Sequence, residues 1–115
     1  MKLAIVGSRN VIVDNMEKYI SACDEIISGG AAGVDRCAAE YAKKNGIRLT
    51  EILPKYDLYG RAAPIIRNKE IVDIADKILI FWNGNSKGTL SVINYAQKTG
   101  KSFEIILCKP PLSKE

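Results

Sequence analysis

The stretch Ser28–Asp35 has the residue types and spacing of a ligand-binding turn. It contains three glycines and two alanines, and it joins an apolar run to a segment with helical spacing. With so little side-chain bulk, the backbone can adopt positive φ angles and a ligand can reach its amide groups. Amides donate hydrogen bonds, so we expect an anionic ligand, although a tight turn without a ligand would need the same glycines. The predicted ligand contacts in this stretch are Gly29, Gly30, Ala31, Gly33 and Asp35.

Asp35 is the only carboxylate of this turn. It falls in the first turn of the predicted helix, where it would repel a second negative charge. We therefore expect it to cap the helix or to accept hydrogen bonds from ribose hydroxyls. Because the chain has no histidine, acid–base chemistry would depend on other titratable residues, and Asp35 is the candidate catalytic residue.

A second turn, Asn83–Thr89, follows the most apolar run of the chain and is the stronger phosphate-binding candidate. Its glycines expose amides, its hydroxyls can donate hydrogen bonds, and its lysine adds a mobile charge. The turn matches neither G-x-x-x-x-G-K-[ST] nor G-x-G-x-x-G, which argues against a P-loop NTPase and an ordinary dinucleotide dehydrogenase. A polar loop with a solvated lysine is the alternative. The predicted ligand contacts here are Gly84, Ser86, Lys87, Gly88 and Thr89.

Two groups that contain arginine complete the set of candidate binding residues. Gly7, Ser8 and Arg9 follow the first apolar run, so the arginine either reaches a ligand or projects into water. Arg67 and Asn68 lie among apolar residues of a predicted helix, and this pair would suit a phosphate or a carboxamide group. A surface arginine fits the same spacing equally well.

Strands and helices that alternate along the chain must position these turns. Apolar runs predict five strands, over 3–6, 25–28, 47–53, 77–82 and 103–108. Helical spacing predicts four helices, from Asp14 or Asn15 to Cys23, from Ala32 or Gly33 to Asn45, from Ala62 or Ala63 to about Asp73, and from Leu90 to Gly100. The segment 55–60 is predicted to be a loop. Strict alternation gives a single-domain α/β fold, a parallel five-stranded sheet between two layers of helices, with the glycine-bearing turns at one edge.

Composition places the chain among ordinary globular proteins. It has 115 residues, 47% hydrophobic and 26% charged, and a net charge of +4. No apolar run approaches the ~20 residues of a membrane span, and the start of the chain leads directly into a strand pattern, so we expect a cytoplasmic protein without membrane contact. Three cysteines and no histidine argue against a zinc site and against a Cys/His nucleophile pair, and we expect Cys23, Cys37 and Cys108 to be buried apolar residues that hold no metal.

Several of these residues form a pattern typical of one family. The pattern consists of Gly7-Ser8-Arg9 with Asp14, the run 29–35 followed by Ala38 and Tyr41-Ala42, the stretch 60–63 leading to Arg67-Asn68, and the run 86–89. It resembles the YspA/YpsA-related branch of the SLOG superfamily, whose members are Rossmann-like relatives of the DprA and LOG proteins. The resemblance implies one Rossmann-like domain over residues 1–108, with 109–115 as a C-terminal tail. The usual sheet order of the family, 3-2-1-4-5, agrees with the alternation derived above.

The resemblance implies binding of a nucleotide or a nucleotide-derived ligand, such as a phosphoribosyl, ADP-ribose or NAD-like molecule, by a sensor or carrier that needs no further cofactor. A hydrolase that cleaves an N-glycosidic or pyrophosphate bond is the alternative. The LOG relatives carry a glutamate in a P-G-G-x-G-T-x-x-E run, and Val92 stands at that position here, so hydrolysis would depend on Asp35 or Asp57. DprA-like binding of single-stranded nucleic acid is the third hypothesis, for which Tyr56, Tyr59 and a few lysines are available. Relatives often dimerise, which makes a homodimer a further hypothesis.

Overall fold

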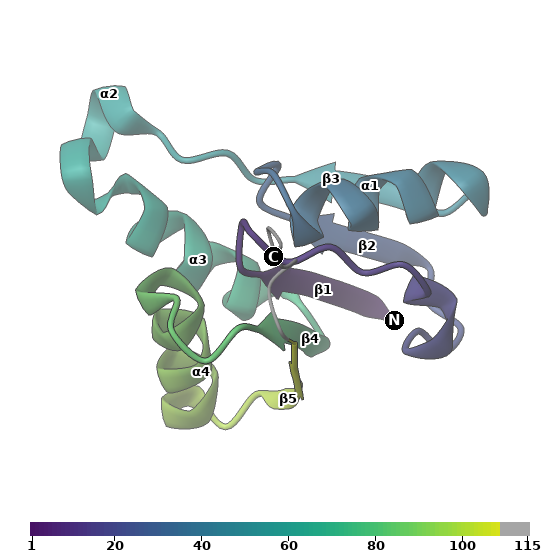
Figure 1. Cartoon of the computed structure of the whole chain (residues 1–115). Coiled ribbons are helices and arrows are strands. Elements are labelled where there is room, and N and C mark those ends of the chain that lie inside the picture. The colour runs from purple at the N-terminus through teal and green to yellow at the C-terminus, as the bar shows by residue number, and fades with distance from the viewer. Residues whose placement is uncertain (109–115) are drawn as a thin grey trace.

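All strands run in one direction and pair into a single sheet in the computed structural model of the chain, which describes residues 1–108 (Figure 1). The strands are β1 (Lys2–Gly7), β2 (Glu25–Ser28), β3 (Arg48–Glu51), β4 (Lys77–Trp82) and β5 (Ser102–Leu107). Their order is β3-β2-β1-β4-β5, with Leu3 opposite Ile26 of β2 and Lys77 of β4. The predicted α/β class, parallel pairing and order 3-2-1-4-5 are therefore confirmed, in a Rossmann-like arrangement.

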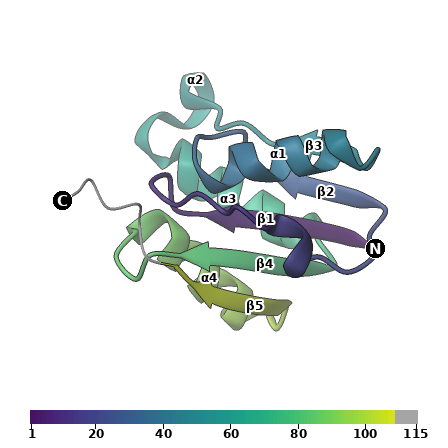
Figure 2. The ribbon, with the colours of Figure 1, turned by 45° about the vertical axis from the view of Figure 1, so that its right-hand side comes forward.

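Helices cover both faces of the sheet, as Figure 2 shows with α1 on one side and α3 and α4 on the other. The helices are α1 (Val34–Lys44), the single turn α2 (Tyr56–Tyr59), α3 (Ala63–Ile74) and α4 (Lys87–Thr99). Two 3-10 turns, η1 (Met16–Lys18) and η2 (Gly60–Ala62), complete the regular elements. Pro64 stands in the first turn of α3, where its missing N–H costs no hydrogen bond.

The core has two halves, one on each face of the sheet, because side chains alternate along every strand. In β4, Ile78 and Ile80 belong to the half that contains α3 and α4. Leu79 and Phe81 belong to the half that contains α1. This double burial explains why the central strands are continuous apolar runs rather than alternating ones.

The predicted helix from Asp14 or Asn15 to Cys23 is wrong, since only the three-residue turn η1 forms there. Asn15 occupies the N-cap position but makes no side-chain cap hydrogen bond. A helix of about nine residues is also shorter than the ~12–15 residues that give marginal stability in isolation. The apolar residues of this segment still pack against the core without forming a helix. Met16 is buried, and the Tyr19 ring meets the Phe81 ring edge-on with 5.2 Å between the ring centroids.

Two further predictions need correction. The segment 55–60 is not an irregular loop, because it contains the helical turn α2, none of whose residues is buried. The three cysteines, expected to be buried, are free thiols that are only half-buried. All three pack at the margin of the core half that contains α1.

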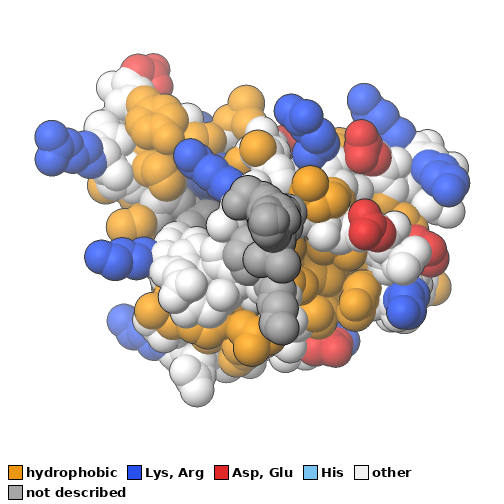
Figure 3. Space-filling model, in the orientation of Figure 1, with side chains coloured by type: hydrophobic (Ala, Val, Ile, Leu, Met, Phe, Trp, Pro, Cys, Tyr) orange, Lys and Arg blue, Asp and Glu red, His pale blue; other side chains and the backbone are white. Residues whose placement is uncertain are grey.

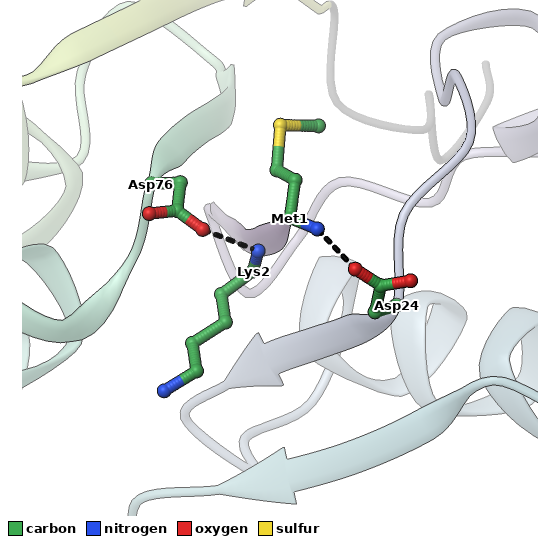
Figure 4. A network of polar contacts seen from close by, with 4 residues as sticks. All are labelled: Met1, Lys2, Asp24 and Asp76. Atoms are coloured by element: carbon green, nitrogen blue, oxygen red, sulfur yellow. Dashed lines mark hydrogen bonds and ion pairs between the residues drawn. The ribbon is translucent and has the colours of Figure 1, made fainter.

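Polar contacts fix the amino-terminal end of the sheet (Figure 4). The amino group of Met1 binds the Asp24 carboxylate, and the Lys2 amide donates to the Asp76 carboxylate at 2.7 Å. In return, the backbone amide of Asp24 donates to the Met1 carbonyl oxygen, and the backbone amide of Asp76 donates to the Lys2 carbonyl oxygen. These contacts join β1 to the segments that lead into β2 and β4, and so support the register of the three central strands.

The predicted C-terminal tail, 109–115, lies outside the residues that the structure describes. Within residues 1–108, none of the helices combines the length and the apolar character that crossing a membrane requires.

Candidate functional site

The turns that follow β1, β2 and β4 meet at one end of the sheet, the end toward which the strand arrows point in Figure 2. Residues of these turns and of the helices α1, α3 and α4 line an open cavity of about 450 Å³. This volume lies within the range of small-molecule sites, and the carboxyl edge of a parallel sheet is where such sites form. Three segments far apart in the sequence thus contribute to one cavity.

Most of the predicted ligand-binding residues line this cavity. They are Gly7, Ser8, Arg9, Gly29, Ala31, Asp35, Arg67, Asn68, Ser86, Gly88 and Thr89. The predicted residues Gly30, Gly33, Gly84 and Lys87 do not line it. The lining also includes residues that the sequence did not predict as ligand contacts, namely Val6, Asn10, Pro64, Ile71, Asn83 and Val92.

Asn10 and Asn83 are the polar residues that sequence reasoning missed. The side-chain amide of Asn83 donates through Nδ2 to the side-chain oxygen of Asn10 at 2.9 Å, which joins the turn after β1 to the turn after β4. The Asn83 oxygen also accepts hydrogen bonds from the amides of Asn85 and Ser86, both at 2.8 Å. Asparagine is common in turns for this reason, so the sequence indicated a turn but not a side chain in a cavity wall.

Buried hydroxyl groups lock the same two turns together. Ser8 is 2% exposed, and its Oγ lies 3.5 Å from the Thr89 hydroxyl and accepts from the Asn83 amide at 3.3 Å. Ser86 is the N-cap of α4 and accepts from the Thr89 amide and hydroxyl. Ser8, Ser86 and Thr89 therefore have structural partners, and the first turn of α4 is held against the cavity.

Arg67 is half-buried and anchored by three hydrogen bonds. Its Nη1 donates to the carbonyl oxygens of Gly29 at 2.7 Å and Ile52 at 3.3 Å, and its Nε donates to the Asn68 side chain at 2.9 Å. Burial lowers the pKa of Arg67, an effect that the Asp35 carboxylate opposes and that Arg9 reinforces. The guanidinium is thus fixed in the cavity wall beside a second cation.

Asp35 is 7% exposed and lies close to Arg67. Its Oδ2 accepts a hydrogen bond from the Ala31 amide at 3.0 Å, so it orders the turn before α1, while Gly33 is the N-cap. Burial raises the pKa of Asp35, and the Ala31 hydrogen bond and the charge of Arg67 only partly oppose this. The carboxyl group therefore favours its protonated form more than an exposed aspartate would.

Two glycines of the β2–α1 turn leave room for neighbouring groups that a side chain would displace. Gly33 has φ +70°, and a Cβ there would collide with the Arg9 carbonyl group. A Cβ on Gly29 would lie 2.5 Å from Nη1 of Arg67 and 3.0 Å from Oδ2 of Asp35. The missing side chain of Gly33 lets the backbone of the segment after β1 approach, and the missing side chain of Gly29 leaves space that Arg67 and Asp35 occupy.

The cations of the site are Arg9 and Arg67. Arg9 is exposed at the cavity, and within residues 1–108 its side chain makes no hydrogen bond or ion pair. Lys87 is the first residue of α4 and lies outside the lining. On the face seen in Figure 3, Lys and Arg side chains are separated by hydrophobic and acidic ones rather than gathered into one basic patch. Within the described part of the chain, no group of three or more Cys, Asp or Glu side chains has a metal-binding arrangement.

Comparison of the chain with protein-family models, with curated proteins and with solved structures finds no match. The chemistry of the cavity must therefore be inferred from its own residues.

Proposed function

We propose that the chain binds a phosphate-bearing nucleotide, or a nucleotide-derived ligand such as a phosphoribosyl, ADP-ribose or NAD-like molecule, in the cavity at the carboxyl edge of the sheet. It acts there as a sensor or carrier. The observation that carries this proposal is the convergence of Arg9, Arg67 and the first turn of α4 on one cavity. The resemblance to the SLOG superfamily supports the same class of ligand.

An anion is the natural partner of this charge arrangement. Arg9 and Arg67 repel each other, and Asp35 is the one carboxylate in the cavity lining. A phosphate between the two guanidinium groups would relieve the repulsion and accept charge-assisted hydrogen bonds from both. The Thr89 amide donates to the Ser86 cap, but the amides of Lys87 and Gly88 have no acceptor inside the helix, so they offer further donors at the start of α4.

The rest of the lining suits a sugar attached to the phosphate. Asp35 can accept hydrogen bonds from ribose hydroxyls, while Asn10 and Asn68 combine donors and acceptors. Val6, Ile71 and Val92 add an apolar floor. A cavity of about 450 Å³ also exceeds what a free phosphate would fill, and ligand sites typically combine apolar surface with a few placed polar groups.

The proposal is tested by titrating the protein with ribose 5-phosphate, AMP, ADP-ribose, NAD and inorganic phosphate, with calorimetry and thermal shift as readouts. Arg9→Gln is the key variant and Lys87→Gln its matched control, because both residues are exposed cations at strand-end turns and only Arg9 lines the cavity. Loss of a charge-assisted hydrogen bond costs about 1.5–3 kcal/mol. We expect Arg9→Gln to weaken phosphate-bearing ligands roughly tenfold or more, and Lys87→Gln to change their affinity less than twofold.

Equal weakening by the two variants would show that Lys87 contributes to phosphate binding as much as Arg9 does, as the sequence alone suggests for Lys87. Absence of any thermal shift with all five compounds at millimolar concentration would contradict the proposal itself.

A hydrolase is the second candidate function, favoured by Asp35. Its carboxyl group lines the cavity, and burial raises its pKa, which are properties of a general acid. The test is to incubate the protein with each ligand that binds and to measure free base or ribose phosphate by chromatography. Product formed by the parent and lost in Asp35→Asn would establish hydrolysis, whereas unchanged ligand with the parent would leave binding as the function.

A further inference from the structure

A second cavity of about 440 Å³ adjoins the first. It lies between the segment after β1 and the first two turns of α1. Arg9 and Asn10 line both cavities, so they form the boundary between them. A ligand that extends past these two residues would enter the second cavity without leaving the surface of the protein.

The second cavity differs from the first in its chemistry. Apolar side chains contribute much of its wall, among them Ile12, which is 63% exposed, and the half-buried Cys37. Glu40 is its only carboxylate and Arg36 its cation besides Arg9. The collision that a Cβ on Gly33 would make with the Arg9 carbonyl shows how closely the two walls approach at the boundary.

These properties match a flat ring better than a phosphate or a sugar. A ring that lies against Ile12 and Cys37 would remove apolar surface from water, which is favourable in proportion to the area covered. An arginine such as Arg36 can stack on the face of a ring. A carboxylate only accepts hydrogen bonds when ionised, so Glu40 selects a ring edge that carries donors.

We propose that the second cavity is a subsite for a planar heterocyclic base with an exocyclic amino group, joined to the phosphate and sugar held in the first cavity. This inference rests on the proposed function, because it assigns the other end of the same ligand. Adenine has an exocyclic amino group that can donate a hydrogen bond to the Glu40 carboxylate. Uracil has carbonyl oxygens along much of its edge, and their partial negative charge would be repelled by that carboxylate.

The experiment compares ribose 5-phosphate, AMP and UMP by calorimetry, with ¹H–¹⁵N spectra to locate the contacts. Ala32→Trp is designed to fill the second cavity, because Ala32 is exposed and lines this cavity but not the first. Ala22→Trp, at an exposed position outside both cavities, is its control. Glu40→Gln tests the hydrogen bond and leaves an exposed polar residue of similar size in place.

We expect the parent to bind AMP about tenfold more tightly than UMP or ribose 5-phosphate. Ala32→Trp should reduce the affinity for AMP to that for ribose 5-phosphate, and Glu40→Gln should bring the affinities for AMP and UMP together. AMP should shift the amide signals of Arg36 and Glu40, whereas ribose 5-phosphate should shift those near Ser8 and Gly88 alone.

Equal affinities of the parent for AMP and ribose 5-phosphate would overturn the subsite and leave the proposed function standing. If Ala32→Trp also weakened ribose 5-phosphate, Glu40→Gln would decide, since an unchanged preference for AMP over UMP in that variant overturns the role of the second cavity. Absence of binding by all three compounds would overturn the proposed function and this inference with it.

Discussion

Gly29 determines how two opposite charges share the wall of the cavity. Its carbonyl group accepts from Arg67 Nη1 at 2.7 Å, and the space where its side chain would stand is occupied by Arg67 and Asp35. The pair makes no direct ion pair within 4 Å, so each group is held by the backbone rather than by the other. A ligand can therefore bind the Arg67 guanidinium without first breaking a salt bridge.

Gly29→Ala should remove this arrangement. The new Cβ would require Nη1 of Arg67 to move, with loss of its hydrogen bonds to Gly29 and Ile52. Loss of hydrogen bonds to a half-buried charged group costs about 1–3 kcal/mol, a decrease in the free energy of unfolding that we expect in chemical denaturation together with weaker phosphate binding. Gly88→Ala is the control, since its Cβ would meet only Ser86 Oγ at 4.0 Å. It should be neutral or stabilise the helix by up to about 1 kcal/mol, and destabilisation equal to that of Gly29→Ala would contradict the argument.

Asp35→Asn should stabilise the protein near neutral pH. Because burial raises the pKa of Asp35 above its usual value of 3.8, the contribution of this group to stability is fully present below that value and is lost as the pH rises through the raised pKa. The asparagine variant has no charge to bury, so its melting temperature should exceed that of the parent at about pH 7 and match it at about pH 3. The exposed Asp57→Asn serves as control. The same difference at both pH values would mean that packing, not ionisation, is responsible.

The sequence predicted most residues of the cavity because strand-end turns in a parallel sheet must share one edge. The sequence could not show which cations line the cavity. Whether Arg9 or Lys87 faces the cavity depends on the direction in which each turn leaves its strand, and a mobile lysine in a glycine-rich turn looks equally suitable. The contact between Gly29 and Arg67 could not be predicted either, because the two residues are 38 positions apart in the chain.

At the scale of elements, the start of α4 depends on its cap. Ser86 Oγ accepts from the Thr89 amide at 3.3 Å, and Asn83 holds the preceding turn through two backbone amides. A side-chain acceptor at the N-cap satisfies an amide that has no partner in the helix. The cap therefore contributes both to stability and to the position of the cavity wall formed by Gly88 and Thr89.

Ser86→Ala should lower the free energy of unfolding by about 0.5–2 kcal/mol, the usual effect of losing an N-cap. Ser21→Ala, at an exposed position in the segment before β2, should leave it within about 0.5 kcal/mol of the parent. Chemical denaturation measures both. Because Thr89 would also lose its hydroxyl partner, the variant should bind phosphate-bearing ligands more weakly, and full stability in Ser86→Ala would show that the cap is not needed.

Long helices could be predicted from spacing and short elements could not. The helices α1, α3 and α4 each have 11 or more residues. An apolar stripe and a stop signal identify α1 and α4, whereas α3 has no clear apolar stripe and is identified by Pro64 in its first turn. The same spacing occurs at Met16, Tyr19, Ile20 and Cys23, yet only the three-residue turn η1 forms there, because a short helix gains too little from packing and capping. The turn α2 has no buried residue, and therefore no apolar stripe in the sequence revealed it.

At the scale of the whole molecule, the sheet is buried at its centre and exposed at its edges. Ala4 and Ile5 of β1 and Ile78 and Ile80 of β4 are 0% exposed. In the edge strand β5, Ile105 is 41% and Leu107 is 72% exposed. The apolar sequence of β5 resembles that of a central strand, so its own residues did not predict its edge position.

Native-state hydrogen exchange should separate these strands. Amides of β1 and β4 can exchange only when the sheet unfolds globally, whereas those of β5 can open locally at the edge. We expect β5 amides to exchange at least about tenfold faster, and low concentrations of urea to accelerate exchange in β1 and β4 more than in β5. Exchange in β5 as slow as in β1 would indicate that a second copy of the chain covers the edge. Sedimentation velocity at several concentrations would then show a dimer, whereas a monomer at every concentration would contradict that explanation and require β5 itself to be as stable as the centre of the sheet.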